Sequence, residues 1–523
     1  MKRFFLANIA LFITLFQAYS SKSGSAIPPE LMNSLLKYAK VCQLVEQNYV
    51  DSVSYDTLCT NAISGMLKKL DPHSSYLTPK QVKASNEVMR NGFDGIGISY
   101  TVIDDTLNVI QVIPGGPSEQ AGLNVGDKLI YADTVSLTGY NMSNDVIQKN
   151  IRGRRGSVLQ LTLLRDGKLL KKSVKRGHIP INSVTASYML TPKIGYIMIE
   201  RFAEHTTDEF EDALKKLKKE GAESLVLDLR GNGGGYLMSA ITLLSHFLPA
   251  GIPLLKTEGV HRQLSVRFSR PGYQKFTNGA LIVLIDSHSA SASEITAGAI
   301  QDLDRGVIVG CRSYGKGLVQ QPYQLADSSE VRITIARYCT PSGRSIQKPY
   351  KNGEYLKTDT IANADSLKYS TLMSGRTVYG GGGVCPDVYI APDTTKLTSF
   401  QKAVLKKQVL VKTSLDYYVK NKTILEEFED CNSLYDSLKI EPVIKKMEQS
   451  LLGVGIDYSS DEMENSKPFF TRYLKALIAR CVFGQKAYYE TLNIESEEVG
   501  TAVSIIEDND RYRRILGEKE NNK

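Results

Sequence analysis

The segment Ser287–Gln320 reads SHSASASEITAGAIQDLDRGVIVGCRSYGKGLVQ, and it decides the fold of the central part of the chain. It follows an apolar, β-branched run at 281–285, which predicts a buried strand. Apolar residues then recur at helical spacing over 292–303, and a second strand is predicted at 307–309. The segment is therefore a strand–turn–helix–strand unit. The turns of such units lie at the carboxyl edge of a sheet, where α/β proteins build their sites.

One serine and one lysine stand on the turns of this unit. Ser291 precedes the predicted helix, and Lys316 lies between Gly315 and Gly317 after the second strand. A serine hydroxyl attacks an amide only when a neighbouring base takes its proton, and a lysine is such a base when its pKa is lowered. Gln320 shares a strand face with Lys316, so we expect it to orient the lysine amine. The pattern predicts a serine–lysine pair for nucleophilic catalysis.

The same residues fit other chemistries less well. Ser291 and Glu294 form an S-x-x-E capping box, so the serine could merely cap its helix. Residues 310–316 fit the start of a phosphate-binding loop, but Gly317 stands where that loop needs Ser or Thr, and a strand follows instead of a helix. His288 suggests a Ser-His-Asp triad. A neighbour at the strand end is poorly placed to reach the same hydroxyl, so we expect an ordinary loop histidine.

A glycine-rich loop, Asp228–Gly235, supplies the electrophilic part of the predicted site. It follows a predicted strand and precedes an apolar helix, so its glycines expose backbone N–H groups at a helix start. Such donors suit a developing oxyanion. We expect one donor from Gly234 or Gly235 and the other from the amide of Ala292. Arg230 is expected to pair with a carboxylate and hold the loop, although the sequence does not name the partner.

These motifs resemble those of the carboxy-terminal processing proteases, also called tail-specific proteases. The resemblance rests on Ser289–Glu294 and Gly315–Gly317, and on four further landmarks in the family order: Leu70–Leu77, Asp228–Gly235, Tyr338–Arg344 and Gly380–Asp387. It implies that Ser291 is the nucleophile, that Lys316 is the base and that Gln320 supports the lysine.

The resemblance also brings in Asp302, because an aspartate at this position is sometimes counted with the site. Eleven helical residues span about 16 Å, so we expect Asp302 to support the structure without touching Ser291. The family resemblance implies a hydrolase without a cofactor. The seven cysteines include no C-x-x-C pair, so no zinc site is predicted, and their odd number leaves at least one thiol free or paired between chains.

Residues 92–177 change to short strands and turns. The GIGI sequence, followed by PGGPSEQAGLNVGDKL at 114–129, resembles a PDZ domain. This implies a carboxylate-binding loop whose backbone amides capture a peptide terminus while the peptide adds a strand; the loop consists of Gly95, Ile96, Gly97 and Ile98. Arg152 follows a predicted groove helix at 143–151. It matches a family arginine thought to link the PDZ domain to the catalytic domain, which would be a regulatory role.

The N-terminus has the pattern of an export signal. Lys2 and Arg3 precede the apolar stretch Phe4–Phe16, and Ala18-Tyr19-Ser20 offers a small-x-small cleavage site. The apolar stretch is short for a permanent membrane span, although an uncleaved anchor is the alternative. We expect export to a bacterial periplasm or association with the periplasmic side of a membrane. The net charge of +8 is modest and dispersed, which gives no case for nucleic acid.

At 523 residues, with 42% hydrophobic and 23% charged residues, the chain should hold three or four globular domains. We predict a multidomain α/β protein in which a PDZ domain, a small β-barrel with helices, precedes a serine protease core of the crotonase-like, tail-specific type. The predicted parts are a signal peptide (1–20), a helical region (21–90), the PDZ domain (91–178), the α/β core (179–395) and a helical C-terminal extension (396–523). Within the extension, 459–466 is expected to form an acidic loop.

The sequence therefore predicts an exported serine endopeptidase that recognises its substrates by their tails. The expected partners are proteins or peptides with apolar C-termini, and the extension is expected to serve packing or homo-oligomer contacts. Two other functions use the same features. One is a PDZ-bearing scaffold whose protease core is silent, against which the intact serine–lysine pair argues. The other is a phosphate-loop nucleotide-binding protein.

Overall fold

The computed structural model describes residues 28–90, 92–139, 143–260, 262–356, 367–391 and 397–518, so the predicted signal peptide lies outside the described residues. The chain forms two compact units. The smaller contains residues 28–78, 322–333 and 351–354, and the larger contains the other described residues. Within these ranges, no helix combines the length and apolar character needed to cross a membrane.

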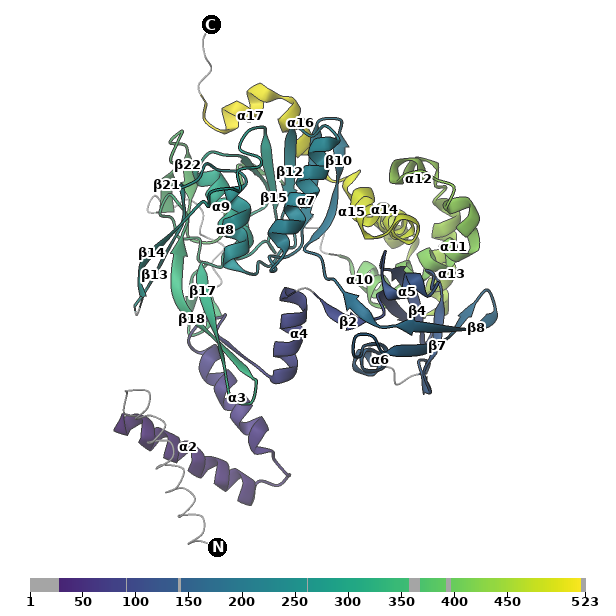
Figure 1. Cartoon of the computed structure of the whole chain (residues 1–523), viewed down its shortest axis with the longest axis horizontal. Helices are drawn as coiled ribbons and strands as arrows, with labels where there is room; N and C mark the ends of the chain where they lie inside the picture. The colour runs from purple at the N-terminus through teal and green to yellow at the C-terminus, as the bar shows by residue number, and fades with distance from the viewer. Residues whose placement is uncertain are drawn as a thin grey trace. The chain divides into compact units, whose positions relative to one another are not determined.

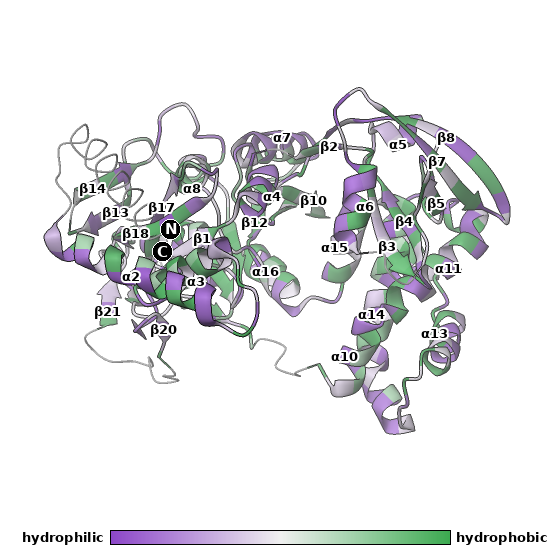
Figure 2. Ribbon diagram, turned by 90° about the horizontal axis from the view of Figure 1, so that it is seen from below, coloured by the Kyte–Doolittle hydropathy of each residue, from purple (hydrophilic) through white to green (hydrophobic). Residues whose placement is uncertain are grey.

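The smaller unit is built from two helices and a short strand (Figure 1). They are α2 (Pro29–Asn48), α3 (Tyr55–Lys68) and β1 (Ser75–Leu77). β1 pairs antiparallel with the first residues of β18 (Glu330–Cys339). The predicted helices are confirmed, and the chain turns between α3 and β1 where the Asp71 carboxylate accepts from the N–H and hydroxyl of Ser74. Hydrophobic and hydrophilic residues alternate along α2 (Figure 2), and none of its residues is buried.

The PDZ domain belongs to the larger unit. Its sheet has the order β3-β4-β5-β7-β8, with β6 pairing β5. The strands are β2 (Phe93–Gly95), β3 (Ile98–Ile103), β4 (Thr106–Val112), β5 (Lys128–Ala132), β6 (Val135–Ser136), β7 (Val158–Arg165), β8 (Lys168–Lys175) and β9 (Gly177–Ile179), and the helices are α5 (Pro117–Gln120) and α6 (Asn144–Ile151). The helix α4 (Pro79–Met89) precedes the domain. Alternate residues of β7, such as Leu161 and Leu163, are buried in one core with Ile147 of α6. The predicted groove helix is confirmed as α6.

The protease core is a six-stranded sheet of order β10-β11-β12-β15-β16-β23. β10 is antiparallel to β11, and the other neighbours are parallel. The strands are β10 (Val184–Thr191), β11 (Ile194–Ile199), β12 (Ser224–Asp228), β15 (Leu281–Ile285), β16 (Val307–Gly310) and β23 (Val388–Tyr389). One face of this sheet is buried with α7 (Thr206–Lys219), α8 (Leu237–Ser245) and α9 (Ala292–Asp302). The predicted alternation of strands and helices is confirmed.

A second, antiparallel sheet adjoins this core. It contains β13 (Pro253–Gly259), β14 (Arg262–Phe268), β17 (Leu318–Gln324) and the second half of β18. β17 is the strand predicted after Lys316. Four shorter strands follow: β19 (Tyr350–Lys351), β20 (Glu354–Tyr355), β21 (Lys368–Ser370) and β22 (Thr377–Tyr379).

The C-terminal extension is helical, as predicted, and it has two parts. The helices are α10 (Ser399–Lys406), α11 (Val409–Leu425), α12 (Cys431–Ser437), α13 (Glu441–Gly453), α14 (Ser460–Phe483), α15 (Gln485–Asn493), α16 (Glu497–Glu507) and α17 (Asn509–Ile515). α10 to α14 surround a core of their own. The prediction of an acidic loop at 459–466 is wrong. Ser459 caps α14 and Glu462 completes the capping box, so these residues begin a helix.

The last two helices cover the second face of the six-stranded sheet. Val499, Ala502 and Ile505 of α16 are buried in one cluster with sheet residues such as Val226 and Ile282. The backbone N–H of Leu281 donates to the hydroxyl of Tyr512 in α17, at 3.0 Å. Because a two-faced sheet needs cover on both sides, the boundary predicted at residue 395 does not separate the α/β core from the extension.

The first part of the extension contacts the PDZ domain. Lys412 of α11 forms an ion pair with Asp104, with Nζ 2.5 Å from Oδ2. Val419, also on α11, approaches Gly126 so closely that a Cβ at that glycine would lie 2.5 Å from its Cγ2. Ile103 and Val125 of the PDZ domain pack against the apolar cluster of the extension. The extension therefore touches the PDZ domain at one end and the protease sheet at the other.

Candidate active site

Ser291 stands on a strained turn between β15 and α9. Its backbone has φ 55° and ψ −110°, a conformation rarely adopted by residues other than glycine. The Asp286 carboxylate holds the turn by accepting from the N–H groups of His288 and Ser289, at 2.9 and 3.0 Å. Ser291 is half-buried at the N-terminus of α9 and at the carboxyl edge of the sheet.

The Glu294 carboxylate joins the serine turn to the lysine loop. Oε2 accepts from the backbone N–H groups of Ser291 and Lys316, at 2.8 and 2.9 Å. Oε1 accepts from the Ser313 hydroxyl at 2.6 Å and from the Gly315 N–H at 2.7 Å. Burial raises the pKa of Glu294 above its ordinary value, although these four hydrogen bonds oppose that effect. One buried side chain thus fixes the two predicted catalytic residues beside each other.

Tyr338 of β18 makes a second link between the same two residues. Its hydroxyl lies 3.2 Å from the carbonyl oxygen of Ser291 and within hydrogen-bonding distance of the carbonyl oxygen of Lys316. Burial keeps the pKa of Tyr338 well above its usual value, so the hydroxyl stays a neutral donor. Lys316 itself is half-buried. The structure thus brings the serine turn and the lysine loop together through two side chains from different elements.

Gln320 and Asp302 occupy supporting positions around this pair. Gln320 lies on β17, and its Nε2 donates to Thr334 Oγ1 of β18 at 3.1 Å. Its expected role beside the lysine amine stays a prediction. Asp302 is fully buried at the end of α9 and forms an ion pair with the equally buried Arg344, with 2.8 Å between Nη2 and Oδ1. It also accepts from the N–H of Ser342. Both contacts join Asp302 to the 340–344 segment, which agrees with a supporting role for this aspartate.

The glycine-rich loop lies directly against Ser291. A Cβ at Gly234, where φ is +98°, would lie 2.7 Å from the Ala290 carbonyl oxygen and 2.8 Å from the Ser291 Cβ, so no side chain fits there. The Gly234 N–H donates to Asn232 Oδ1 at 2.8 Å. That amide is occupied in this conformation, so an oxyanion could use it only after this bond breaks. The first choice of donor from the sequence is therefore not supported by the geometry.

Two other predicted donors are placed differently. The N–H groups of Gly235 and Ala292 make no hydrogen bond to any residue that the structure describes. Gly235 packs on the Phe202 backbone, where a Cβ would lie 2.0 Å from the carbonyl oxygen. Ala292 is the first residue of α9, whose N–H has no partner within its own helix. Their expected role as donors for a tetrahedral intermediate stays a prediction.

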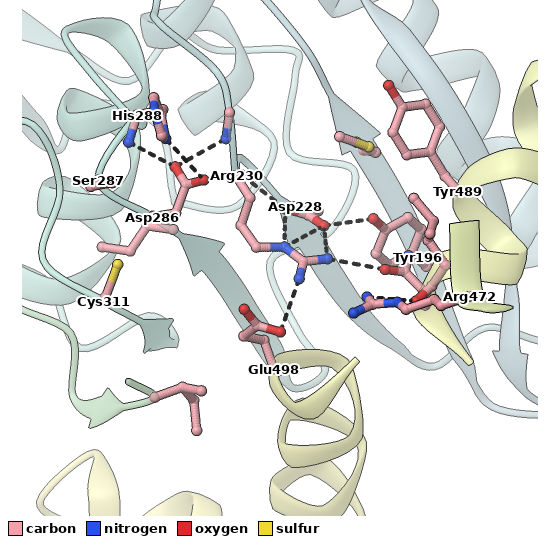
Figure 3. A pocket seen from close by; sticks show the side chains of 16 residues that line it. Tyr196, Asp228, Arg230, Asp286, Ser287, His288, Cys311, Arg472, Tyr489 and Glu498 are labelled. Atoms are coloured by element: carbon pink, nitrogen blue, oxygen red, sulfur yellow. Dashed lines mark hydrogen bonds and ion pairs between the residues drawn. The ribbon is translucent and has the colours of Figure 1, made fainter. Parts of the chain in front are cut away.

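Arg230, whose partner the sequence could not name, binds two carboxylates. Its Nη2 lies 2.6 Å from Asp228 Oδ2, and its Nη1 lies 3.1 Å from Glu498 Oε2 of α16. Asp228 is fully buried and also accepts from the Tyr196 hydroxyl at 2.6 Å. Figure 3 shows Glu498 reaching from α16 toward Arg230. The loop that carries the glycines is therefore held by the C-terminal extension.

A cavity of about 470 Å³ lies beside this arginine and not around Ser291. His288 lines it, with its side chain 79% exposed and Nδ1 3.7 Å from Asp286 Oδ2. It is thus the loop residue expected from the sequence, and Figure 3 shows it beside Asp286. Lys316 leads into the strand β17 and not into a helix, which excludes the phosphate-loop arrangement.

All seven cysteines are free thiols. In the ranges that the structure describes, no group of three or more His, Cys, Asp or Glu side chains could hold a metal ion.

The predicted peptide-binding loop opens the first long PDZ strand. Ile96 is buried in the PDZ core, and its carbonyl accepts from the Ser118 N–H at 2.9 Å. Gly97 has φ +78°, and its carbonyl accepts from the Ile113 N–H at 3.0 Å. Ile98 begins β3. These bonds shape the loop around its backbone, and its capture of a peptide carboxylate stays a prediction.

Arg152 follows α6 and reaches outside the PDZ sheet. Its Nη1 lies 2.5 Å from Glu87 Oε2 of α4, and its guanidinium carbon lies 3.9 Å from the centroid of the Phe93 ring. The last residue of α4, Met89, accepts at its carbonyl from the N–H of Glu204 in the protease core. Arg152 is thus linked to the core through α4, and its regulatory role stays a prediction.

A PDZ domain beside an α/β core with a serine on a strained turn defines the class of PDZ-bearing serine peptidases. Sequence comparison agrees part by part. Residues 193–353 match "Peptidase family S41", 95–175 match "PDZ domain", 15–81 match "Activating protease CtpB N-terminal domain" and 400–484 match "Family of unknown function (DUF8443)". The 193–353 segment thus belongs to peptidase family S41, and the chain is similar to the C-terminal processing proteases.

Two bacterial relatives support the same assignment. The chain is 35% identical over 317 residues to the carboxy-terminal processing protease CtpB of Bacillus subtilis (strain 168), covering 60% of this chain and 65% of that protein. It is 32% identical over 340 residues to a probable CtpA-like serine protease of Staphylococcus aureus (strain bovine RF122 / ET3-1), covering 65% and 66%. A photosystem II D1 C-terminal processing protease aligns with 27% identity, 68% and 93% coverage and a TM-score of 0.35. The match thus spans just under two thirds of the two bacterial relatives' length.

Several residues of the site escaped the sequence analysis. Glu294 appeared only as half of a capping box, although an acidic residue amid small and apolar ones was a signal of a buried role. Asn232 was hidden among glycines, and Tyr338 lay in a landmark with no assigned task. Glu498 gave no signal, because it lies 268 positions after its partner Arg230.

Proposed function

We propose that the protein is an exported serine endopeptidase that binds protein C-terminal tails with its PDZ domain and cleaves peptide bonds with Ser291 and Lys316. One observation carries the proposal: the Glu294 carboxylate binds the backbone of both residues. A scaffold with a silent core has no need for this double attachment. The family membership and the PDZ domain support the same activity.

The chemistry follows from these positions. The Lys316 amine takes the proton of the Ser291 hydroxyl as Oγ attacks the scissile carbonyl carbon. The resulting oxyanion accepts hydrogen bonds from Ala292 and Gly235. The lysine ammonium then gives its proton to the leaving amine, and an acyl-enzyme remains on Ser291. Water, deprotonated by the same lysine, releases the acyl group and restores the serine.

Substitution of the pair tests the activity. Ser291→Ala and Lys316→Ala should each lower the rate of peptide cleavage by at least about 10²-fold, because a required base contributes about 10²–10⁴-fold. The double variant should be little slower than either single variant, since the two act as a unit. A serine-directed phosphonate should label Ser291 in the wild type. An unlabelled serine would favour the scaffold. A Lys316→Ala variant with more than about a tenth of the wild-type rate would contradict the lysine as the base.

Two peptides that differ only in a terminal carboxylate or amide test the tail recognition. Both are assayed for binding to full-length Ser291→Ala protein and for cleavage by the wild type. The carboxylate should bind and be cleaved better when its last residue is apolar, because the 95–98 loop offers amides to an anion. Gly97→Val should reduce both, since a Cβ at Gly97 would lie 3.1 Å from Ile179 Cδ1. Equal results for the two peptides would contradict tail recognition.

The export proposal rests on the N-terminal pattern of basic and apolar residues. Expression of the full chain in a bacterium with an outer membrane, followed by fractionation and N-terminal sequencing, tests it. We expect a periplasmic product that begins after Ser20, or an uncleaved form on the periplasmic side of the membrane. A cytoplasmic product that still begins at Met1 would contradict it.

A further inference from the structure

Arg230 is bound from two parts of the chain at once. Its Nε and Nη2 donate to the Asp228 carboxylate, at 3.0 and 2.6 Å. The opposite side of the guanidinium meets the extension: Nη1 donates to Ser496 Oγ at 3.0 Å and Nη2 to Asn493 Oδ1 at 3.1 Å. Glu498 adds an ion pair at 3.1 Å. A planar guanidinium with five N–H donors suits such a fork.

These contacts are electrostatically matched and shielded from water. Asp228 is fully buried, and the Arg230 side chain is 19% exposed. Burial acts to lower the pKa of Arg230, but Asp228 and Glu498 hold it above its usual value. Burial acts to raise the pKa of Glu498, but Arg230 and the Ser496 hydroxyl hold it below its usual value. Arg230 and Glu498 are thus both charged at neutral pH, and removing one of them leaves the other poorly compensated.

The extension offers Arg230 a fixed support. Asn493 ends α15 and donates from Nδ2 to the hydroxyl of Tyr188 in β10, at 2.8 Å. Val499 and Ala502 of α16 are buried against the sheet. Glu498 stands in the first turn of that anchored helix. These groups therefore have little freedom to follow the arginine if it moves.

The residues that follow Arg230 in the glycine-rich loop contact the serine turn. The next residue, Gly231, donates from its N–H to Asp286 Oδ1 of the serine turn at 3.0 Å. Three residues further, Gly234 lies against Ser291. The cavity of about 470 Å³ is lined by Arg230, Gly231 and Glu498, so an arginine released by the extension has space to enter. Asp228 on one side and the extension on the other hold Arg230 in its present position.

We propose that Asn493, Ser496 and Glu498 of the C-terminal extension are positioning residues for catalysis, acting through Arg230 on the loop that supplies the oxyanion donor. The proposal rests on the peptidase activity proposed above and deepens it. It gives the end of the extension a task in the reaction beyond covering the sheet.

Glu498→Gln in the full-length protein tests this task, with Glu497→Gln as its matched control. The control removes the same charge from the neighbouring, exposed position of the same helical turn. We expect Glu498→Gln to lower kcat at least about 10-fold, counted per serine labelled by phosphonate, because small displacements of a catalytic loop are costly. KM should change less than about twofold, since oxyanion donors act in the transition state.

Two further measurements separate positioning from loss of fold. A peptide boronic acid, which forms a tetrahedral adduct with the serine, should bind Glu498→Gln more weakly by the same factor as kcat falls. Amide hydrogen exchange over 231–236 should be faster in Glu498→Gln than in Glu497→Gln, while exchange in β15 stays unchanged. Exchange does not depend on activity, so it also decides the proposal if the wild type shows no Ser291-dependent cleavage.

The outcomes are distinct. Equal kcat, boronate affinity and loop exchange in the two variants would overturn the proposal while leaving the peptidase intact. A parallel fall in kcat and rise in KM with faster exchange throughout the sheet would assign Glu498 a purely structural role and also overturn it. Wild-type protein that cleaves no better than Ser291→Ala would instead refute the proposed peptidase activity.

Discussion

The two loops that meet at the candidate site, the serine turn at 286–291 and the glycine-rich loop at 229–236, are fixed in opposite ways. They leave the ends of neighbouring parallel strands, β15 and β12. The serine turn is held mainly by nearby side chains, Asp286 and Glu294, although the N–H of Gly231 in the other loop also donates to Asp286. The glycine-rich loop is held by Arg230, whose partner Ser496 lies 266 positions further along the chain.

This difference separates the chemistry of the site from its geometry. A nucleophile and its base need a short, self-contained motif, because their mutual distance decides whether a proton can transfer. Oxyanion donors need only to be aimed at the right point, so any firm support can aim them. The chain uses its own distant end as that support. Substitutions in the two loops should therefore fail in different ways.

The largest effect is expected where the two loops touch. Gly234→Ala would place a Cβ 2.8 Å from the Ser291 Cβ at a positive φ, and the loop must move away. We expect kcat to fall about 10²–10³-fold, the loss typical of a missing oxyanion donor. Gly233→Ala is the control, because nothing lies within 4 Å of its Cβ position and its φ is not positive. Steady-state kinetics on both variants checks this, and similar rates would contradict the close packing.

Glu294→Gln should disturb the serine turn and the lysine loop but leave the glycine-rich loop in place. An amide has one oxygen for the four donors that the carboxylate now serves, and its NH₂ group would face N–H groups. We expect kcat to fall about 10²-fold as the lysine loop shifts, and the melting temperature to fall as well. Hydrogen exchange should quicken at 313–316 and stay unchanged at 231–236. An equal increase in exchange rate at 313–316 and 231–236 would show that the two segments do not have independent supports.

Tyr338→Phe sharpens the same contrast with a milder change. It removes only the hydroxyl that links the carbonyl oxygens of Ser291 and Lys316. The loss of about 1–1.5 kcal/mol for one buried hydrogen bond corresponds to a roughly tenfold fall in kcat, with KM unchanged. Single-turnover kinetics separates this from slow product release. An unchanged rate of acylation would mean that Glu294 alone holds the pair.

The smallest effect concerns His246, which ends α8, the helix that follows the glycine-rich loop. Burial lowers the pKa of His246 to about 4. The unfolded chain binds a proton there below about pH 6.5 and the folded chain does not, so stability falls as the pH decreases from about 6.5 to about 4. At pH 6 the expected loss is about 0.8 kcal/mol relative to pH 8. Urea unfolding of wild type and His246→Gln checks this, and equal pH slopes would contradict it.

The sequence could predict what depends on local pattern. The strands at 194–199 and 281–285 have the expected bounds, since buried parallel strands read as continuous apolar runs. The serine and the lysine loop came from a motif in which spacing and chemistry coincide. The family resemblance supplied the order of the domains, which periodicity alone does not give.

The remaining features depend on contacts that no local pattern encodes. α16 packs on strands of the protease sheet, and β16, the last of those that it contacts, ends nearly two hundred residues before α16 begins. The apolar residues of α16 therefore predicted a helix but could not indicate the sheet on which it packs. The occupied amide of Gly234 follows from one side-chain rotamer of Asn232. The acidic run at 459–466 was misjudged because polar composition outweighed a capping signal, Ser459 with Glu462, that was visible in the sequence.

The cover that α16 and α17 give the sheet has a consequence for how the enzyme comes into being. These helices follow the strands that they cover in the chain, so the second layer of the core cannot close before they have been made. An incomplete chain, whether still in synthesis or cut short by a premature stop, would expose the apolar face of β12 and β15 and leave Arg230 without its distal partners. Under the proposed peptidase activity, a fragment that lacks α16 and α17 is therefore expected to be inactive.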